Sequence, residues 1–495
     1  MPPSFVVRFR SRFLICGALF ALALLPSLVM PSPLSAQCTL DWDPTAGVPG
    51  ADGPVYATAV YDDGNGAALF VGGDFTTIGG VAAPTGLARF DGTTWTAVGT
   101  NVLDGGTVRA LSVFESALGE GERLYIGGEF FGVGTNFIAL VAAYDGTTWD
   151  TLAGGMEGSV VSAFQEFDPG TGPRLYAAGS FTTAGGNFSE GIAGWSGTTW
   201  VPIGSGAVGG TPQSLGVHDA GSGLELYIGG SFTSIAGVAA TNIARTDGAT
   251  IAPLDVGVNG AVRAIQSFGS NLVVGGEFTQ AGITLTSFLA TWDGVNWGAP
   301  IDAIPDAPVN VLLSASVDGI DQLAIGGAFA TLSGAPTSNI AFWDGSLVTP
   351  LGLGADGEVT ALTEFAGPGL VPPGLYVGGG FSQVEGLAAS GIARYETCLP
   401  VIDVLFERGD VNSDGGVNIA DAIAHLGILF ATGIPVNCEE ALDVNQDGSS
   451  NIADPVYLLA FLFTANSPAP PAPFGVCGVD TDGDGLDCAF STNGC

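Results

Sequence analysis

The seven residues Leu69-Phe70-Val71-Gly72-Gly73-Asp74-Phe75 form a phrase that returns along most of this 495-residue chain. An apolar run comes first, two small residues follow, and a phenylalanine closes the phrase. Six variants come later: Gly127-Gly128-Glu129-Phe130, Ala178-Gly179-Ser180-Phe181, Gly229-Gly230-Ser231-Phe232, Gly275-Gly276-Glu277-Phe278, Gly326-Gly327-Ala328-Phe329 and Gly378-Gly379-Gly380-Phe381. Their spacing averages 51 residues between Phe75 and Phe381, so the chain contains seven copies of one structural unit.

Each copy contains four short runs that suit β-strands. In the first copy they are Val55–Val60, Ala68–Val71, Gly86–Phe90 and Thr94–Val98. Four strands of ordinary length and their hairpin loops fit into a repeat of this size. A period near 50 with strand-like content is typical of propeller blades. We therefore predict a mainly β fold, with a seven-bladed β-propeller over residues 37–400.

Glycine marks two further features of the repeat. The glycine pairs predict a close approach of backbones near the ring axis, and the phenylalanines after them predict filling of the wedge between blades. A second glycine follows an aspartate or serine between the third and fourth runs. An Asp-Gly pair there predicts a type I′ hairpin turn. The pairs are Asp91-Gly92, Asp145-Gly146, Ser196-Gly197, Asp247-Gly248, Asp293-Gly294 and Asp344-Gly345.

The seventh copy lacks its last strand. After Tyr395 the pattern ends at Cys398, without the tryptophan-containing run that closes other copies. Thr39 to Trp42 resembles Thr93 to Trp95, so we expect the N-terminal segment to complete the seventh blade. Cys38 and Cys398 would then meet, and a disulfide there would close a very long loop, which the chain-entropy estimate values at about 4 to 5 kcal/mol.

Residues 1–36 predict export from the cell. They contain no acidic residue, Arg8, Arg10 and Arg12 precede an apolar run from Phe13 to Leu25, and small residues end at Ala36. This is the pattern of a secretory signal peptide, so we expect a secreted protein with no stable membrane span after cleavage. An uncleaved anchor is the alternative. Six cysteines then remain, an even number that suggests disulfides: Cys38, Cys398, Cys438, Cys477, Cys488 and Cys495.

The charge is strongly one-sided. The formal net charge is −37, and there is no lysine. Such a surface repels phosphate backbones, which disfavours nucleic acid as a partner. Because hydrophobic residues make up 46% of the chain, it is not an acidic disordered protein and has enough apolar content for a large core.

Beyond a short linker at 401–408, residues 409–466 carry two matched loops. Oxygen-bearing side chains at alternate positions, with glycine at the sharp turn, are what Ca²⁺ requires, so we predict two calcium sites. Each loop leads into an apolar, helical run, Ala422–Phe430 or Pro455–Phe463. The candidate ligands are Asp410, Asn412, Asp414, Gly416, Asn418 and Asp421 in the first loop and Asp443, Asn445, Asp447, Ser449, Asn451 and Asp454 in the second.

The remaining residues, 467–495, form a proline- and cysteine-rich tail. It carries a third acidic cluster at Asp480, Asp482, Asp484 and Asp487. No helical run follows this cluster, and the sequence leaves open whether it binds a metal ion.

Two family resemblances rest on these motifs. The loop pair, with aspartate at position 12 and one helix after each loop, resembles a type I dockerin, which implies an EF-hand-like, calcium-binding α-helical domain. The blade phrases look like kelch-type propellers grouped with the galactose oxidase central domain. Dockerins usually carry Ser-Thr at loop positions 10 and 11 to bind cohesin, whereas this chain has Ile419-Ala420 and Ile452-Ala453. The calcium ligands therefore carry over, and a cohesin-like partner is left open.

The sequence offers no clear catalytic constellation. Only His218 and His425 exist, so a multi-histidine copper or zinc centre cannot form in the propeller. The remaining arginine and tryptophan candidates recur at equivalent repeat positions, which favours structural roles: Arg89, Arg245 and Arg394; Arg109 and Arg263; and Trp95, Trp149, Trp200 and Trp297. Paired acids for glycoside hydrolysis remain open because 48 carboxylates are present.

We therefore predict a secreted, non-catalytic binding or scaffolding protein. Its calcium module would serve assembly, and its propeller would bind an extracellular protein or glycan through the unrepeated connections between first and second strands. These are Glu115–Arg123, Phe167–Arg174, His218–Gly223 and Pro368–Pro373, with Phe268–Asn271 as the short counterpart. A hydrolase acting on O-glycosyl bonds, or an accessory protein in polysaccharide breakdown, is the alternative.

Overall fold

The computed structural model describes residues 41–44, 48–99, 106–130, 132, 140–317, 320–366, 374–397, 406–412, 415–430, 438–464 and 467–475. The predictions for the signal peptide, the Cys38–Cys398 disulfide, Asp414, the connection 368–373 and the acidic cluster at 480–487 fall outside these residues.

Most of the described chain forms seven antiparallel sheets, which we number as blades 1 to 7. Each blade has four main strands that pair in order from the inside of the ring outward. Blades 1 to 3 consist of β2 (Val55–Asp62), β3 (Ala67–Gly73), β6 (Leu87–Phe90) and β7 (Trp95–Ala97); β8 (Gly106–Glu115), β9 (Glu122–Phe130), β10 (Val141–Tyr144) and β11 (Trp149–Asp150); and β12 (Met156–Phe167), β13 (Arg174–Ala184), β15 (Ile192–Trp195) and β16 (Trp200–Pro202).

Blades 4 to 7 repeat this arrangement. They consist of β18 (Thr211–Asp219), β19 (Leu224–Ser231), β22 (Ile243–Thr246) and β23 (Ile251–Pro253); β24 (Val262–Phe268), β25 (Asn271–Gly276), β28 (Leu289–Trp292) and β29 (Trp297–Gly298); β30 (Val309–Val317), β31 (Ile320–Gly327), β34 (Ile340–Trp343) and β35 (Val348–Pro350); and β36 (Val359–Phe365), β37 (Gly374–Gly379), β40 (Ile392–Glu396) and β1 (Trp42–Asp43). The prediction of a mainly β, seven-bladed propeller is confirmed.

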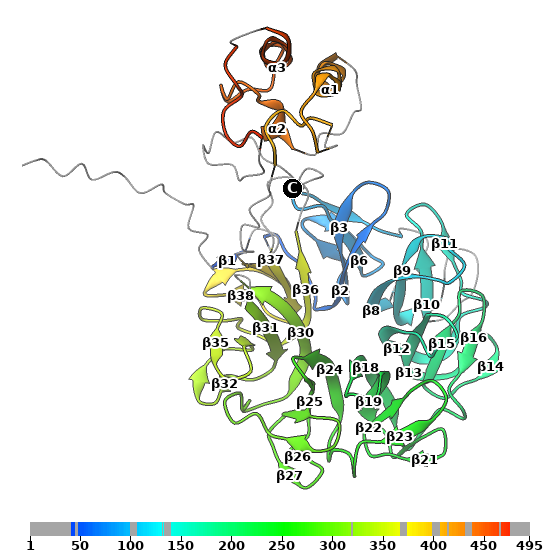
Figure 1. Cartoon of the computed structure of the whole chain (residues 1–495). Coiled ribbons are helices and arrows are strands. Elements are labelled where there is room, and N and C mark those ends of the chain that lie inside the picture. Colours follow the sequence, from blue (N-terminus) through cyan, green and yellow to red (C-terminus); the bar gives the residue numbers. More distant parts are fainter. Residues whose placement is uncertain are drawn as a thin grey trace, which may run out of the picture. The chain divides into compact units, whose positions relative to one another are not determined.

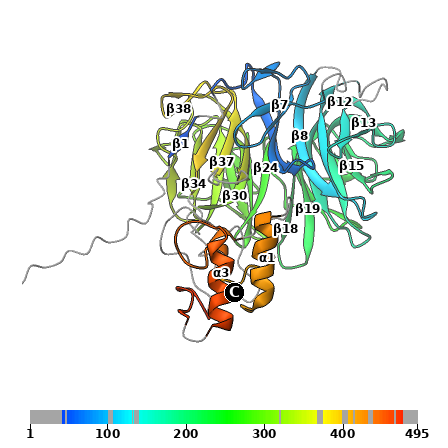
Figure 2. The same cartoon turned by 90° about the horizontal axis from the view of Figure 1, so that it is seen from above.

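The first strands of the blades line the inside of a closed ring (Figure 1). Each contacts the first strand of the next blade, and β36 of blade 7 contacts β2 of blade 1. A hydrogen bond of 2.6 Å joins the hydroxyls of Thr58 and Thr363 across this last seam. Figure 2 shows the strands running between the two faces of the ring. The core lies between neighbouring blades, as in the cluster where Phe75 of blade 1 packs with Phe365 and Tyr376 of blade 7.

Strand β1 completes the seventh blade, as the sequence predicted. Trp42 pairs with Tyr395, and Asp43 pairs with Arg394. The Trp42 indole is 5% exposed and donates its Nε1–H to the carbonyl of Leu351 in the preceding blade at 2.9 Å. Trp200 and Trp297 make the equivalent bond to the blades before theirs. The N-terminal strand thus reproduces the outer strand of an ordinary repeat.

The two glycines of each pair are required for different steric reasons. A Cβ on the second glycine of any pair would lie 2.1 to 2.3 Å from a backbone oxygen in the blade's own first strand or in the residue just before it. A Cβ on the first glycine would instead meet a valine of the next blade, as Gly378 would meet Val55 Cγ1 at 2.6 Å. The phenylalanines that follow are all buried. Both packing predictions for this phrase are confirmed.

Replacing Gly378 with alanine should lower the free energy of unfolding of the propeller by about 1 to 3 kcal/mol, because the added methyl group overpacks the seam between blades 7 and 1. Adding Val55→Ala should recover part of the loss by removing the opposing methyl groups. Denaturant unfolding followed by tryptophan fluorescence measures both. A Gly378→Ala variant as stable as the parent would show that the seam is looser than the structure indicates.

The turns between third and fourth strands differ from the prediction. Phe90 pairs with Trp95, which leaves a four-residue loop instead of the predicted two-residue type I′ turn. Only Gly92 of the Asp91-Gly92 pair has positive φ, at 99°. The Asp91 side chain accepts the backbone N–H groups of Thr93 and Thr94, at 2.9 and 2.7 Å, so the aspartate caps the loop from within. This side-chain bond favours the longer turn.

The sequence also missed short strands outside the four main strands of each blade. Strand β14 (Asn187–Phe188) lengthens blade 3, and β17 (Ala207–Val208) joins the pair β20 (Ser234–Ile235) and β21 (Val238–Ala239). The other pairs are β4 (Thr77–Ile78) and β5 (Val81–Ala82), β26 (Gln280–Ala281) and β27 (Thr284–Leu285), β32 (Thr331–Leu332) and β33 (Ala335–Pro336), and β38 (Gln383–Val384) and β39 (Leu387–Ala388). Two-residue strands are too short for an alternating pattern.

The C-terminal segment contains the helices α1 (Ile419–Phe430), α2 (Glu439–Leu442) and α3 (Ala453–Phe463). Helices α1 and α3 contact each other, and Ala422, Val444 and Leu458 form their buried cluster. Within the described ranges, no helix combines the length and apolar character needed to cross a membrane.

Residues on both sides of the helices pack into this segment. Phe406, placed in the linker by the sequence, is buried against Cys438 and Ala441. On the other side, the Phe474 ring meets Phe461 edge-on at 5.1 Å. The segment therefore forms a small core of its own from Phe406 to the beginning of the proline-rich tail.

Candidate functional site

The described connections between first and second strands emerge at one end of the ring, which we call the rim. Antiparallel pairing brings the turn between third and fourth strands to this same end. The prediction that the connections at the rim differ from blade to blade is only partly correct, because blades 1, 3 and 4 have the same type of turn. In each, an aspartate accepts the N–H groups of glycines two and four residues later, as Asp219 does from Gly221 and Gly223 at 2.7 and 2.9 Å.

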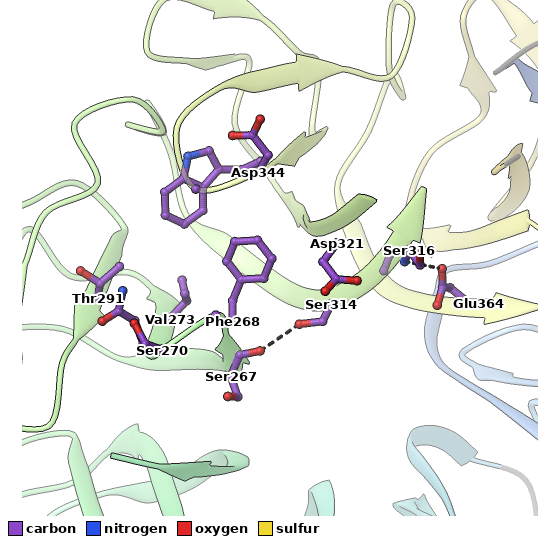
Figure 3. A pocket seen from close by; sticks show the side chains of 15 residues that line it. Ser267, Phe268, Ser270, Val273, Thr291, Ser314, Ser316, Asp321, Asp344 and Glu364 are labelled. Atoms are coloured by element: carbon purple, nitrogen blue, oxygen red, sulfur yellow. Dashed lines mark hydrogen bonds between the residues drawn. The ribbon is translucent and has the colours of Figure 1, made fainter. Parts of the chain in front are cut away.

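One pocket opens at the rim between blades 5 and 6 (Figure 3). Its volume is ≈ 700 Å³, within the range of roughly 300 to 1,000 Å³ typical of small-molecule sites. Its walls come from the two-residue turn after β24, from strand β30 and from the turn after β34, and Figure 3 shows Phe268 in the middle of the group. The remaining lining includes Ser270, Thr291, Ser314, Ser316, Asp321, Trp343, Asp344 and Glu364.

Two carboxyl groups of this pocket titrate differently. Burial raises the pKa of Glu364 above its ordinary value, although the carboxylate accepts the N–H of Ser316 at 3.1 Å. The backbone N–H groups of Leu347 and Ser346 lower the pKa of Asp344. Asp247 and Asp293 have lowered pKa values for the same reason at equivalent turns. The lowered pKa of Asp344 is therefore a property of the repeated turn and does not mark a catalytic pair.

His218 does not belong to the connection in which the sequence pattern placed it. It lies on β18, is 3% exposed, and its Nδ1 is 2.8 Å from the Ser267 hydroxyl. Burial lowers its pKa, so the ring is neutral at pH 7. Because consecutive strand side chains point to opposite faces, Ser267 turns toward His218 while Phe268 turns toward Trp343. The histidine–serine pair thus joins blades 4 and 5, and Ser267 also lines the pocket, whereas His218 does not.

The repeated arginines and tryptophans have structural partners, as predicted. Arg89 pairs with Asp63 and Arg394 with Asp43, at 3.2 and 2.7 Å, while Arg109 pairs with Glu129 at 2.9 Å. Trp95 and Trp149 pack against aromatic side chains of their own blades. These residues leave no unpaired cationic cluster among the described positions of the propeller strands.

The two predicted calcium loops have matching hydrogen bonds. Asp421 accepts the N–H groups of Asn412 and Asn418 at 3.2 and 2.8 Å. In the second loop, Asp454 accepts those of Asn445 and Asn451 at the same two distances. Each position-12 aspartate thus ties together the two ends of its own loop.

The sharp turn of each loop is equally alike. The carboxylates of Asp410 and Asp443 accept the N–H groups of Gly415 and Gly448, at 3.1 and 2.8 Å. Both glycines have positive φ, at 84° and 78°, which explains glycine at this position. Four carboxylates are fully buried in this arrangement: Asp410, Asp421, Asp443 and Asp454.

The second loop offers a test of whether a cation fits. The Oδ1 atom of Asn445 is buried without a hydrogen-bond partner, and burial raises the pKa of Asp454. A cation would satisfy both oxygens. Over the ranges that the structure covers, no group of three His, Cys, Asp or Glu residues is placed to hold a metal by itself, and Asp447 is exposed. Amide and backbone oxygens such as those of Asn451 and Ser449 would have to complete the shell.

His425 on α1 gives this segment a pH dependence. The ring is fully buried, its Nε2 is 3.1 Å from the Ser450 hydroxyl, and burial lowers its pKa to about 4. Since the folded form takes up a proton less readily than the unfolded form, stability should fall as the pH drops from about 6.5 toward 4, by about 2 kcal/mol. Helical circular dichroism at saturating calcium measures this. A His425→Gln variant should flatten the profile, and an unchanged profile would contradict the assignment.

Comparisons with known proteins add little to this picture. No protein-family model matches the chain, and no curated protein matches it. Among solved structures, the computationally designed Ika8 protein aligns with a TM-score of 0.38 at 14% identity, covering 70% of this chain and 98% of that one. The structure of BBS1N in complex with ARL6DN, soaked with lead, aligns with a TM-score of 0.41 at 12% identity, covering 72% and 98%. The fold assignment rests on the strand pairing.

Proposed function

We propose that this chain is a secreted, non-catalytic binding protein whose propeller holds an extracellular ligand at the rim. The observation that carries the proposal is the pocket between blades 5 and 6. Strand residues that recur in every blade are used by packing and by ion pairs, whereas the walls of this pocket include Phe268 and Ser270 at the short connection after β24. Convergent polar and aromatic groups in a concave site are the ordinary signature of ligand binding.

The C-terminal segment would be a calcium-dependent assembly module of the kind that a type I dockerin represents. The support is the matched pair of loops, the buried carboxylates and the unpartnered Oδ1 of Asn445. Candidate ligands in the first loop are Asp410, Asn412, Asp414, Gly416, Asn418 and Asp421, and in the second Asp443, Asn445, Asp447, Ser449, Asn451 and Asp454. Calcium would neutralise the buried carboxylates and hold each loop against its helix.

The alternative is an enzyme of polysaccharide breakdown. One observation favours it, namely that Glu364, with a raised pKa, and the exposed Asp321 line the same pocket. A second carboxylate with a lowered pKa would complete an acid–base pair with Glu364, and Asp344 has one. Its lowered pKa, however, comes from the hydrogen bonds of its own turn, and this turn recurs in other blades, which argues against an enzyme.

Hydrogen–deuterium exchange of the full chain with insoluble neutral polysaccharides and with calcium-bridged pectate tests the proposal. Protection is expected in rim peptides that contain 116–121, 168–173, 220–223 and 268–271, and none in the opposite hairpins around Ile283 and Leu285, which are 91% and 79% exposed. A reducing-end assay should detect no released sugar. Protection confined to the opposite face would refute the rim, and sugar release would establish the enzyme.

A further inference from the structure

Four seams between blades follow one rule at the rim. In blades 2 to 5, the turn after the third strand lies against the first connection of the preceding blade. A Cβ on the turn glycine would lie 2.3 Å from the Asp63 carbonyl oxygen for Gly146 and 2.1 Å from Pro169 Cβ for Gly248. The seams of blades 2 and 3 and of blades 4 and 5 are equally tight, at 2.8 and 2.9 Å. In these four seams the preceding connection lies directly against the turn.

The seam between blades 5 and 6 breaks this rule. A Cβ on Gly345 would lie 3.8 Å from the edge of the Phe268 ring and meets no backbone within 4 Å. The reason is the length of the connection, since only Gly269 and Ser270 separate β24 from β25, whereas four residues separate β18 from β19 in blade 4. The pocket occupies the space that a longer connection fills elsewhere.

Shortening the connection also exposes aromatic and polar groups together. The Phe268 ring is half-buried and packs on Trp343 at 5.8 Å. Trp343 is 6% exposed, and its Nε1–H has no hydrogen-bond partner. Hydroxyl and carboxylate oxygens surround this apolar wall, and the lining contains no Lys, Arg or His. The pocket therefore offers an apolar surface, carboxylate acceptors and hydroxyl groups that can both donate and accept hydrogen bonds.

This combination discriminates between ligand classes. An anion would face Asp321, Asp344 and Glu364 without a compensating cation, which is unfavourable. A lysine or arginine side chain would satisfy the carboxylates but carries no acceptor for the hydroxyl groups of Ser270, Thr291 and Ser316. A neutral sugar has an apolar ring face, hydroxyl donors for the carboxylates and hydroxyl acceptors for these side chains.

We propose that the pocket between blades 5 and 6 binds a neutral saccharide unit, with its apolar face on Phe268 and its hydroxyl groups on Asp321 and Glu364. This inference rests on the proposed binding function of the rim and narrows it to one seam and one ligand class.

Calorimetry and ligand-observed NMR on the full chain with calcium test the proposal. The probes are cellobiose, xylobiose, mannobiose and N,N′-diacetylchitobiose, with digalacturonate and a lysine-rich peptide as charged counterparts. At least one neutral disaccharide should bind, and digalacturonate should not. If no neutral disaccharide binds up to its solubility limit, or if only the peptide binds, the saccharide assignment is wrong, while the exchange experiment still decides whether the rim binds anything.

Two variants place the site. Giving blade 5 the longer connection of blade 4, Asp219 to Gly223, should fill the seam and abolish binding. Asp321→Ala should weaken binding about three- to tenfold by removing an acceptor. Asp302→Ala is the matched control, since Asp302 is also exposed but does not line the pocket. Saccharide binding that survives the longer connection would overturn the site, as would equal effects of the two aspartate variants.

Discussion

Replacing Arg408 with methionine is expected to destabilise the C-terminal segment by about 3 to 5 kcal/mol, the largest effect of any single substitution considered in this chain. Arg408 and Glu440 form an ion pair in which both side chains are fully buried. The guanidinium also donates to the carbonyls of Asp443 and Glu440, at 2.6 and 3.3 Å. Without the arginine, a carboxylate and two carbonyl groups stay buried with weaker compensation.

The chain allows this segment to be observed separately. All eight tryptophans lie between Trp42 and Trp343, and the helices that the structure describes lie between Ile419 and Phe463. Tryptophan fluorescence therefore follows the propeller, and circular dichroism at 222 nm follows the C-terminal segment. Arg408→Met should lower the helical transition and leave the fluorescence transition in place.

Two further variants separate the buried pair from a general effect of removing an arginine. Arg123 lies at the surface, pairs with Glu120 and Asp150 at 3.3 and 3.2 Å, and should cost at most about 1 kcal/mol when changed to methionine. Adding Glu440→Leu to Arg408→Met should recover much of the loss, because no charge then stays buried alone. A double variant as unstable as the single one would mean that the bonds from Arg408 to the carbonyls, and not the ion pair, carry the stability.

The ring could be predicted from the sequence because every blade must satisfy the same packing. A Cβ on a glycine of these pairs would clash with a backbone oxygen or with a valine of the next blade. The same steric constraint therefore recurs along the sequence. The single exception, Ala178, precedes a blade in which Pro212 takes the register position that valine holds elsewhere. Trp42 could be assigned to blade 7 for the same reason, since it makes the contact that Trp200 and Trp297 make.

The pocket could not be predicted in this way. It results from residues that are missing from one connection, and its walls come from two blades that a sequence pattern treats separately. The burial of His218 was missed for a related reason. Its neighbours Asp219, Gly221 and Gly223 indicate a turn, but strand β18 extends through His218 and brings it against Ser267 of the next blade. The pocket and the burial of His218 both depend on contacts between repeats. Residue spacing within one repeat does not indicate such contacts.

The loops of the C-terminal segment could be predicted only in part. Their spacing gives the ligand types, and the glycines at position 6 have the positive φ that the turn needs. The spacing does not reveal that Arg408 links the second loop to Glu440, because this contact joins a residue before the first loop to the helix before the second.

Removing calcium is expected to unfold the C-terminal segment and to leave the propeller folded. A metal that binds only the folded form stabilises it in proportion to the logarithm of its excess, by about 4 kcal/mol at a thousandfold excess over Kd. Chelation should therefore lower the helical transition by a comparable amount, whereas the tryptophan fluorescence transition should stay in place. If chelation leaves the unfolding transition of the helices unchanged, the proposed calcium sites are wrong.

Stoichiometry then assigns the two sites. Calorimetry of the full chain should give two ions per chain, and Asp410→Ala or Asp443→Ala should each leave one. Both residues also hold their loops through backbone bonds to Gly415 and Gly448, so alanine changes shape as well as charge. Asp443→Asn is the sharper variant, because its amide oxygen can still accept the N–H of Gly448 while the negative charge is lost. If Asp443→Asn still binds two ions with unchanged affinity, the carboxylate of the second loop is not a ligand, and the matched hydrogen bonds of the two loops serve the fold alone.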